Sequence, residues 1–160
     1  MSQAQADQAE FARLVGEIAG AIGNRPLDAQ LEAWLNATYP ASNATFQKIA
    51  ALIAQGDKDG WICQREAGGI RFCRPVKPHA EAGHFSVDVV FMKPVRGGRH
   101  THPLGEIGMI IPTDGTPKFD GVSTSWYVYG PGTSHHPTMT DGSAYVIYLL
   151  PEGSIEFERA

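Results

Sequence analysis

The chain has 160 residues, of which 42% are hydrophobic and 19% are charged, and its formal net charge is −4. This length and balance are typical of one folded domain, and mild acidity without a basic run argues against nucleic acid or an anionic membrane surface as a partner. No apolar run approaches the ~20 residues of a membrane span, and residues 1–8 lack the features of a secretory signal. We therefore expect a cytoplasmic protein.

The N-terminal third shows helical periodicity. Apolar side chains between Phe11 and Ile22 recur with i, i+3, i+4, i+7 spacing, and the polar turn 56–60 should end the helical segment. The expected helices are residues 4–22, about 27–37 and about 43–55. Because short helices are marginal alone, the segment 1–58 should either cover one face of a following sheet or form a dimer interface.

From Trp61 onward the apolar pattern changes to the alternation of β-strands. Many short strands at spacings of about 8–12 residues indicate an antiparallel sandwich or barrel over 59–160, which forms one compact domain with the helices. The expected strands are 61–65, 70–74, 84–92, 106–112, 125–129, 144–150 and 155–157, with a turn at 113–117 and a weak strand or loop at 119–123.

The hairpin expected over 61–74 carries apolar residues on both faces, which suits strands between a barrel interior and a helical layer. Arg71 shares a face with Cys73. If that face is the inner one, Arg71 needs an anionic partner, either a substrate carboxylate or, more commonly, a protein carboxylate. Cys63 and Cys73 should be free thiols in a reducing cytoplasm.

A polar row alternates with apolar residues on the expected strand 84–92. It consists of His84, Ser86 and Asp88. These side chains share one face because residues two apart on a strand point the same way. The row faces either solvent or a wet cavity.

The stretch 100–106 concentrates side chains that can bind a metal. His100 and His102 should point to one side of an extended strand, and Glu106 can bend back toward them after a short turn. His135 follows a Gly-Pro-Gly turn further along the chain. Three imidazoles and one carboxylate suit a divalent transition metal such as Zn, Fe, Ni, Mn or Co. The alternative is a pair of loop histidines beside a solvated glutamate.

The spacing of these residues resembles the cupin superfamily. There, a first motif contributes HxH and a glutamate three or four residues on, and a second contributes a histidine after a Pro-x-Gly-x-x turn. The ligand spacing of the first motif is matched by His100, His102 and Glu106, and Gly132-x-x-His135 matches the core of the second. The resemblance implies a mainly β fold, a cupin-type antiparallel β-barrel or jelly roll with an N-terminal helical segment.

The match departs from the superfamily pattern at two places. Pro94 stands where a glycine usually opens the first motif, and the proline of the second motif is displaced to Pro131. Neither change removes a ligand. Because neighbouring residues on a strand point oppositely, only one of His135 and His136 should coordinate, and the spacing from Gly132 favours His135.

The layout as a whole looks like the bacterial 4-hydroxylaminobenzoate lyases of nitrobenzoate breakdown. Its two marker stretches are GGRHTHPLGEIG at 97–108 and WYVYGPGTSHHP at 126–137. The resemblance implies conversion of 4-hydroxylaminobenzoate and water to 3,4-dihydroxybenzoate with release of ammonia. It also implies one metal and no organic cofactor, and we expect a homo-oligomer, such as a homodimer.

This chemistry assigns roles beyond the ligands. The metal would act as a Lewis acid, a general acid would assist the leaving group, and an arginine would hold the substrate carboxylate with a two-point fork. The candidates for the acid are Tyr127, Tyr129 and His84, and those for the carboxylate are Arg71, Arg96 and Arg99.

Two other interpretations fit the same ligands. One is a cupin dioxygenase or isomerase acting on another small molecule, which oxygen consumption would separate from a lyase. The other is a non-enzymatic cupin that binds a small molecule, although an intact four-ligand set favours an enzyme.

Overall fold

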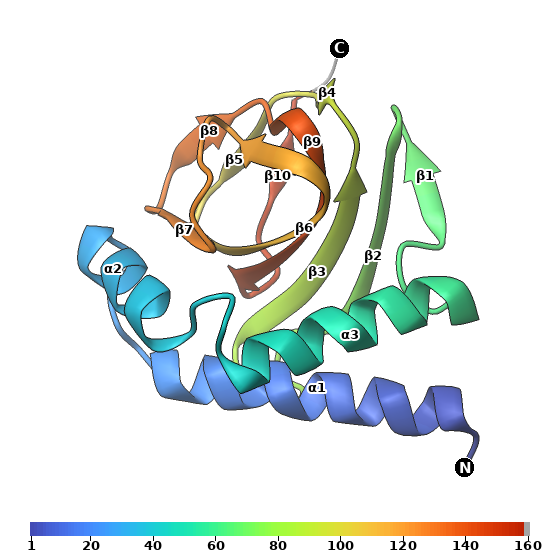
Figure 1. Ribbon diagram of the computed structural model, residues 1–160. Helices are drawn as coiled ribbons and strands as arrows, with labels where there is room; N and C mark the ends of the chain where they lie inside the picture. Colours follow the sequence, from blue (N-terminus) through green and yellow to red (C-terminus); the bar gives the residue numbers. More distant parts are fainter. Residues whose placement is uncertain (159–160) are drawn as a thin grey trace.

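The computed structural model describes residues 1–158, in which three helices precede a mostly antiparallel β-structure (Figure 1). The helices are α1 (Gln3–Ile22), α2 (Ala29–Thr38) and α3 (Ala44–Asp59). The strands are β1 (Arg65–Ala67), β2 (Ile70–Val76), β3 (Phe85–Met92), β4 (Val95–Arg96), β5 (His100–His102), β6 (Glu106–Phe119), β7 (Trp126–Tyr129), β8 (Thr133–His135), β9 (Thr138–Pro151) and β10 (Glu156–Phe157). The barrel range predicted to end at 160 includes residues 159 and 160, which lie outside the described part.

The helices begin at polar N-caps. In α1 the Ser2 side chain accepts from the Gln5 backbone while the Gln5 side chain accepts from Ser2, a capping box that satisfies two backbone donors. Asp28 and Asn43 cap α2 and α3. The three predicted helices are thereby confirmed, and none of those described is long and apolar enough to cross a bilayer.

The third helix ends later than predicted, at Asp59 instead of about residue 55. Gly60 has φ of 84° and supplies the left-handed C-cap. A Cβ at Gly56 would lie 2.7 Å from Ile62 Cγ1 and from a ring atom of Trp61. The missing side chain thus serves close packing of the following loop against the helix rather than termination of the helix.

Two sheets form the β-structure. The larger has the order β1-β2-β3-β9-β6-β7, with β4 beside β9, and the smaller has the order β10-β5-β8. Figure 1 shows α1 and α3 along one side of the larger sheet, while β5, β8 and β10 lie on its other side. This arrangement is the jelly-roll fold with an N-terminal helical segment that the resemblance implies.

Two predictions of strand ends are wrong. The expected turn 113–117 lies inside β6, because register shifts and the positive φ of Gly115 absorb the turn-forming residues without ending the pairing with β9. Conversely, 61–64 is not a strand, since Cys63 adopts a φ of 54° and pairing with β2 starts only at Arg65. Both cysteines are free and buried, as predicted.

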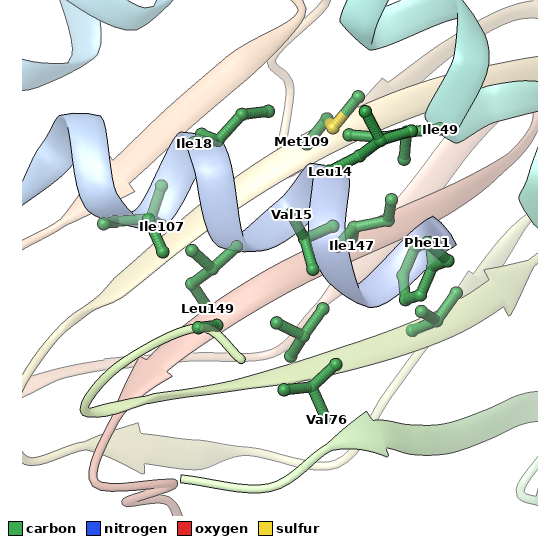
Figure 2. Close-up of a cluster of buried hydrophobic side chains, with 14 of the residues drawn as sticks. Phe11, Leu14, Val15, Ile18, Ile49, Val76, Ile107, Met109, Ile147 and Leu149 are labelled. Carbon is green, nitrogen blue, oxygen red and sulfur yellow. The ribbon is translucent and has the colours of Figure 1, made fainter. Parts of the chain in front are cut away.

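The central strands of the larger sheet are buried on both faces. Figure 2 shows α1 and α3 side chains packed onto those of the sheet, among them Leu14, Ile49, Ile107 and Ile147. The opposite face holds a second cluster: Met92, Ile110, Phe119, Tyr127, Met139, Ala144 and Val146. Because side chains alternate along β6 and β9, each strand contributes to both clusters. The second cluster lies on the side that carries the histidines.

Candidate metal centre

Three imidazoles converge between β5 and β8. His100 and His102 point the same way from a three-residue strand, and β5 pairs with β8 so that His100 stands directly opposite His135. The three Nε2 atoms lie 3.0 Å (His100–His102), 3.0 Å (His102–His135) and 2.9 Å (His135–His100) apart. Nitrogens at such distances can share one ion at about 2.0–2.1 Å. These residues could therefore hold a metal ion.

His100 and His102 are in the protonation state that a metal requires. Burial, together with the neighbouring imidazoles, lowers the pKa of His100 to about 4 and that of His102 to about 3. His102 is fully buried and His100 nearly so. Because a ligating imidazole must be neutral, both rings are ready to coordinate at neutral pH.

Glu106 adds a carboxylate from the first position of β6. It is 3% exposed, and its Oε2 lies 3.5 Å from His102 Nε2. Within residues 1–158 neither Glu106 Oε2 nor His102 Nδ1 has a hydrogen-bond partner. Burial raises the pKa of Glu106 to about 8. An unpartnered buried carboxylate is costly, and a cation held by the three histidines would remove that cost. The donor set thus fits a metal.

Asp120 orients His135 and was not predicted. Its Oδ2 lies 2.6 Å from His135 Nδ1 and accepts from the Tyr129 hydroxyl at 2.6 Å, while Oδ1 accepts from the Thr138 backbone at 2.8 Å. A carboxylate on the far nitrogen of a histidine is a recurrent way to fix a metal ligand. In the sequence, Asp120 before Gly121 signals only a turn, so nothing there points to this role.

The two tyrosines differ in their surroundings. Tyr127 is buried beside Glu106, and its hydroxyl has no hydrogen-bond partner among the described residues. Gly108 stands opposite it on β6, and a Cβ there would overlap the Tyr127 ring. Tyr129 is half-buried, and its hydroxyl already donates to Asp120. Tyr127 is therefore the tyrosine whose hydroxyl remains available.

Four other candidates lie away from the histidines. His84 lines a surface cavity beside α1. Arg71 faces the helices, where two of its nitrogens each lie 2.7 Å from an Asp57 oxygen, so its partner is a protein carboxylate. Arg96 is exposed on β4, and Arg99 pairs with Glu158 at 2.8 Å. The structure does not bring these four side chains to the site, and their catalytic or substrate-binding roles stay predictions.

Of the neighbouring His135 and His136, it is His135 that lies with His100 and His102, as the sequence favoured. His136 instead lies 3.1 Å from the Gly97 carbonyl through its Nδ1. The sequence left open whether the polar row His84, Ser86 and Asp88 faces solvent or a wet cavity. Ser86 is 0% and Asp88 6% exposed, and both lie on the sheet face opposite the helices. Ser86 and Asp88 therefore line the interior, whereas His84 is half-buried in the surface cavity beside α1.

A small cavity adjoins the ligands. It measures about 50 Å³, and Glu106, His100 and His135 contribute to its wall together with Tyr127 and Tyr148. The rest of its lining is apolar. A small, mostly apolar space beside the imidazoles offers room for water and for the reacting end of a ligand, while limiting access of bulk solvent.

A jelly roll that aims two histidines, a glutamate and a distant third histidine into its interior defines a cupin. Comparison with known protein families identifies the family within the cupins. A family model described as "PnbB: 4-hydroxylaminobenzoate lyase" matches residues 13–157. The chain belongs to the 4-hydroxylaminobenzoate lyase family, as the sequence patterns predicted, and it is an enzyme.

Two relatives carry the name 4-hydroxylaminobenzoate lyase. The one from Pseudomonas putida is 30% identical over 154 residues, covering 86% of this chain and 88% of the relative. The one from Nocardioides sp. (strain LMS-CY) is 31% identical over 146 residues, covering 86% of each. These relatives favour a lyase over the dioxygenase, isomerase and non-enzymatic alternatives.

Among solved structures, the chain is similar to DMSP lyase DddQ from Ruegeria pomeroyi DSS-3, at 17% identity and a TM-score of 0.47, covering 97% of this chain and 96% of that one. It is also similar to an RmlC-like cupin protein from Ralstonia eutropha JMP134, at 10% identity and a TM-score of 0.46. That match covers 58% of this chain and 62% of that one.

Proposed function

We propose that the protein converts 4-hydroxylaminobenzoate and water to 3,4-dihydroxybenzoate and ammonia, with one divalent transition metal and no organic cofactor. The metal ligands are His100, His102 and His135, with Glu106 as the fourth. The observation that carries the proposal is the convergence of three imidazole Nε2 atoms within 3.0 Å of one another, in a chain of this lyase family.

A bound metal would supply Lewis acidity toward the substrate or a water molecule. The chain's own residues must handle protons, because the N–O bond breaks with its electron pair on oxygen and that oxygen needs a proton to leave as water. Two waters then enter the ring at C3 and C4 while ammonia departs, so that one water is consumed in total.

Tyr127 is the proposed proton donor to the leaving oxygen. Tyr127 lines the same small cavity as His100, Glu106 and His135. Burial, reinforced by the neighbouring Glu106, raises its pKa well above the ordinary value, so the hydroxyl holds its proton at neutral pH. Tyr129 and Asp120 act on His135 and serve as positioning residues. Cytoplasmic location and homodimer formation stay predictions.

The test is to purify the protein without a metal-affinity column, determine its metal by elemental analysis, and supply 4-hydroxylaminobenzoate under anaerobic conditions. We expect about one equivalent of a transition metal per chain, and equal amounts of ammonia and 3,4-dihydroxybenzoate. A requirement for oxygen would support the dioxygenase alternative and reject the proposal.

A further inference from the structure

A larger cavity of about 470 Å³ lies along the same sheet as the small one. Tyr148 lines both cavities. On β2, Ile70 lines the small cavity, and the next residues on that face, Phe72 and Arg74, line the large one. On β3, Val90 lines the small cavity and Asp88 lines the large one. Because residues two apart on a strand share a face, the two cavities follow one another along β2 and β3, with Tyr148 in the wall of each.

The larger cavity is cationic. Arg65, Arg74 and Lys77 line it, and Asp88 is the acidic residue in its lining. Asp88 fixes the Arg74 guanidinium, with Nε–Oδ1 at 2.6 Å and Nη2–Oδ2 at 3.4 Å, while the same Nη2 donates to the Gly153 carbonyl at 3.2 Å. One carboxylate against three cations leaves an excess of positive charge at the mouth of the interior.

Aromatic side chains connect this charge to the metal ligands. Phe72, Tyr148 and Phe157 line the larger cavity. The Phe157 ring also packs edge-on against His100, with ring centroids 5.6 Å apart, although Phe157 itself is 72% exposed. A flat ring held among these side chains would have one end at the cations and the other at the imidazoles.

We propose that the larger cavity binds the carboxylate of an aromatic acid, with Lys77 and Arg65 at the rim and Arg74 as the main contact. The contact uses Arg74 Nη1, because Nε and Nη2 already bond to Asp88 and Gly153. Asp88 is a positioning residue, because its two bonds to Nε and Nη2 fix the orientation of the guanidinium plane. The para substituent of the ring then points toward His100 and the other ligands. The identity of the substrate rests on the proposed function, whereas the carboxylate site rests on the cavity.

The test uses 4-aminobenzoate, which lacks an N–O bond and is not turned over, and its neutral counterpart 4-aminobenzamide. In calorimetric titrations of the metal-loaded protein, we expect the carboxylate to bind about tenfold or more tightly than the amide. Arg74→Gln should abolish most of this preference without changing the metal content. Arg74→Lys should keep part of it, because it preserves the charge but loses the planar guanidinium that Asp88 orients.

A second variant protects the test against misfolding. Arg74→Gln leaves Asp88 buried without its partner, so the double variant R74Q/D88N removes both charges together and should show the same loss of preference. Arg71→Gln removes an arginine of the same strand from the opposite face, and the preference should survive. Retention of the full preference in R74Q and in R74Q/D88N would overturn the proposal. If the wild-type protein shows no lyase turnover but R74Q still loses the preference for the carboxylate, the proposed function is rejected and the carboxylate site stands.

Discussion

Asp120 is the residue on which the orientation of His135 depends. Replacement with asparagine keeps an oxygen for the Thr138 backbone but removes the charge beside His135 Nδ1. We expect a loss of about 10–100-fold in metal affinity, measured by competition with a chelator of known affinity. Asp141→Asn is the matched control, since Asp141 also has a positive φ but is exposed. Equal metal affinity in D120N and wild type would show that Asp120 does not orient His135 for metal binding.

The Tyr127 hydroxyl carries the proposed proton transfer. Tyr127→Phe should lower kcat by about 10²–10⁴-fold and leave metal content unchanged, because the ring continues to fill the same space. Steady-state turnover and elemental analysis check both parts. Tyr129→Phe should act differently, since its hydroxyl anchors Asp120 and its loss should weaken metal retention. A Y127F enzyme with wild-type kcat would assign the proton to another group.

For individual residues, the sequence predicted the candidate metal ligands but not the side chains that orient a ligand or line the larger cavity. His100, His102 and Glu106 were visible because their spacing is short and local. Asp120 and Arg74 were not, because each acts through strand pairing that joins distant segments, and a turn aspartate or a strand arginine looks ordinary in the sequence. For Arg71, alternation along the strand predicted that it shares a face with Cys73. Its partner Asp57 could not be predicted, because Asp57 lies near the end of α3, on a different element.

Among the elements, the β6–β7 pair depends on a missing side chain. Gly108 faces Tyr127 across the pair, and a methyl group there would overlap the ring. We expect Gly108→Ala to destabilise the protein by about 1–3 kcal/mol through overpacking, as measured by urea denaturation.

Gly20→Ala provides the contrast, because a Cβ at Gly20 in α1 meets nothing within 4 Å. That substitution should stabilise the helix by up to about 1 kcal/mol. If both alanine variants shifted stability in the same direction and by equal amounts, the close approach of Tyr127 to β6 would be wrong.

Elements were predicted better in their interiors than at their ends. Amphipathic periodicity identified all three helices and most of the strands, since it reflects which face is buried. The continuation of α3 through Gly56 and of β6 through 113–117 was missed. In both cases tertiary contacts, with Trp61 and with β9, reversed the local preference of turn-forming residues.

In the whole molecule, the helical layer is joined to the sheet by a polar contact as well as by the apolar core. Asp57 of α3 pairs with Arg71 and also accepts from the Tyr145 hydroxyl. The Arg71 guanidinium, aided by Tyr145, holds the pKa of Asp57 below its ordinary value. A carboxylate with a depressed pKa in the folded state stabilises the fold above its unfolded pKa of about 3.9.

Asp57→Asn should therefore lower stability at neutral pH, and this difference from wild type should shrink as the pH falls through the folded pKa of Asp57. Since the pair is partly exposed, solvent screening limits the effect to about 1 kcal/mol. Urea midpoints measured from pH 7 down to pH 3 check the trend. A difference between variant and wild type that did not depend on pH would contradict this role of the Asp57 charge.

The most direct test of the central claim is the metal content and turnover of His102→Ala. His102 is fully buried and its Nε2 lies 3.0 Å from those of both other histidines, so its loss should open the ligand set. We expect a folded protein that retains little metal and releases no 3,4-dihydroxybenzoate or ammonia from 4-hydroxylaminobenzoate. Wild-type metal content together with wild-type turnover would contradict it.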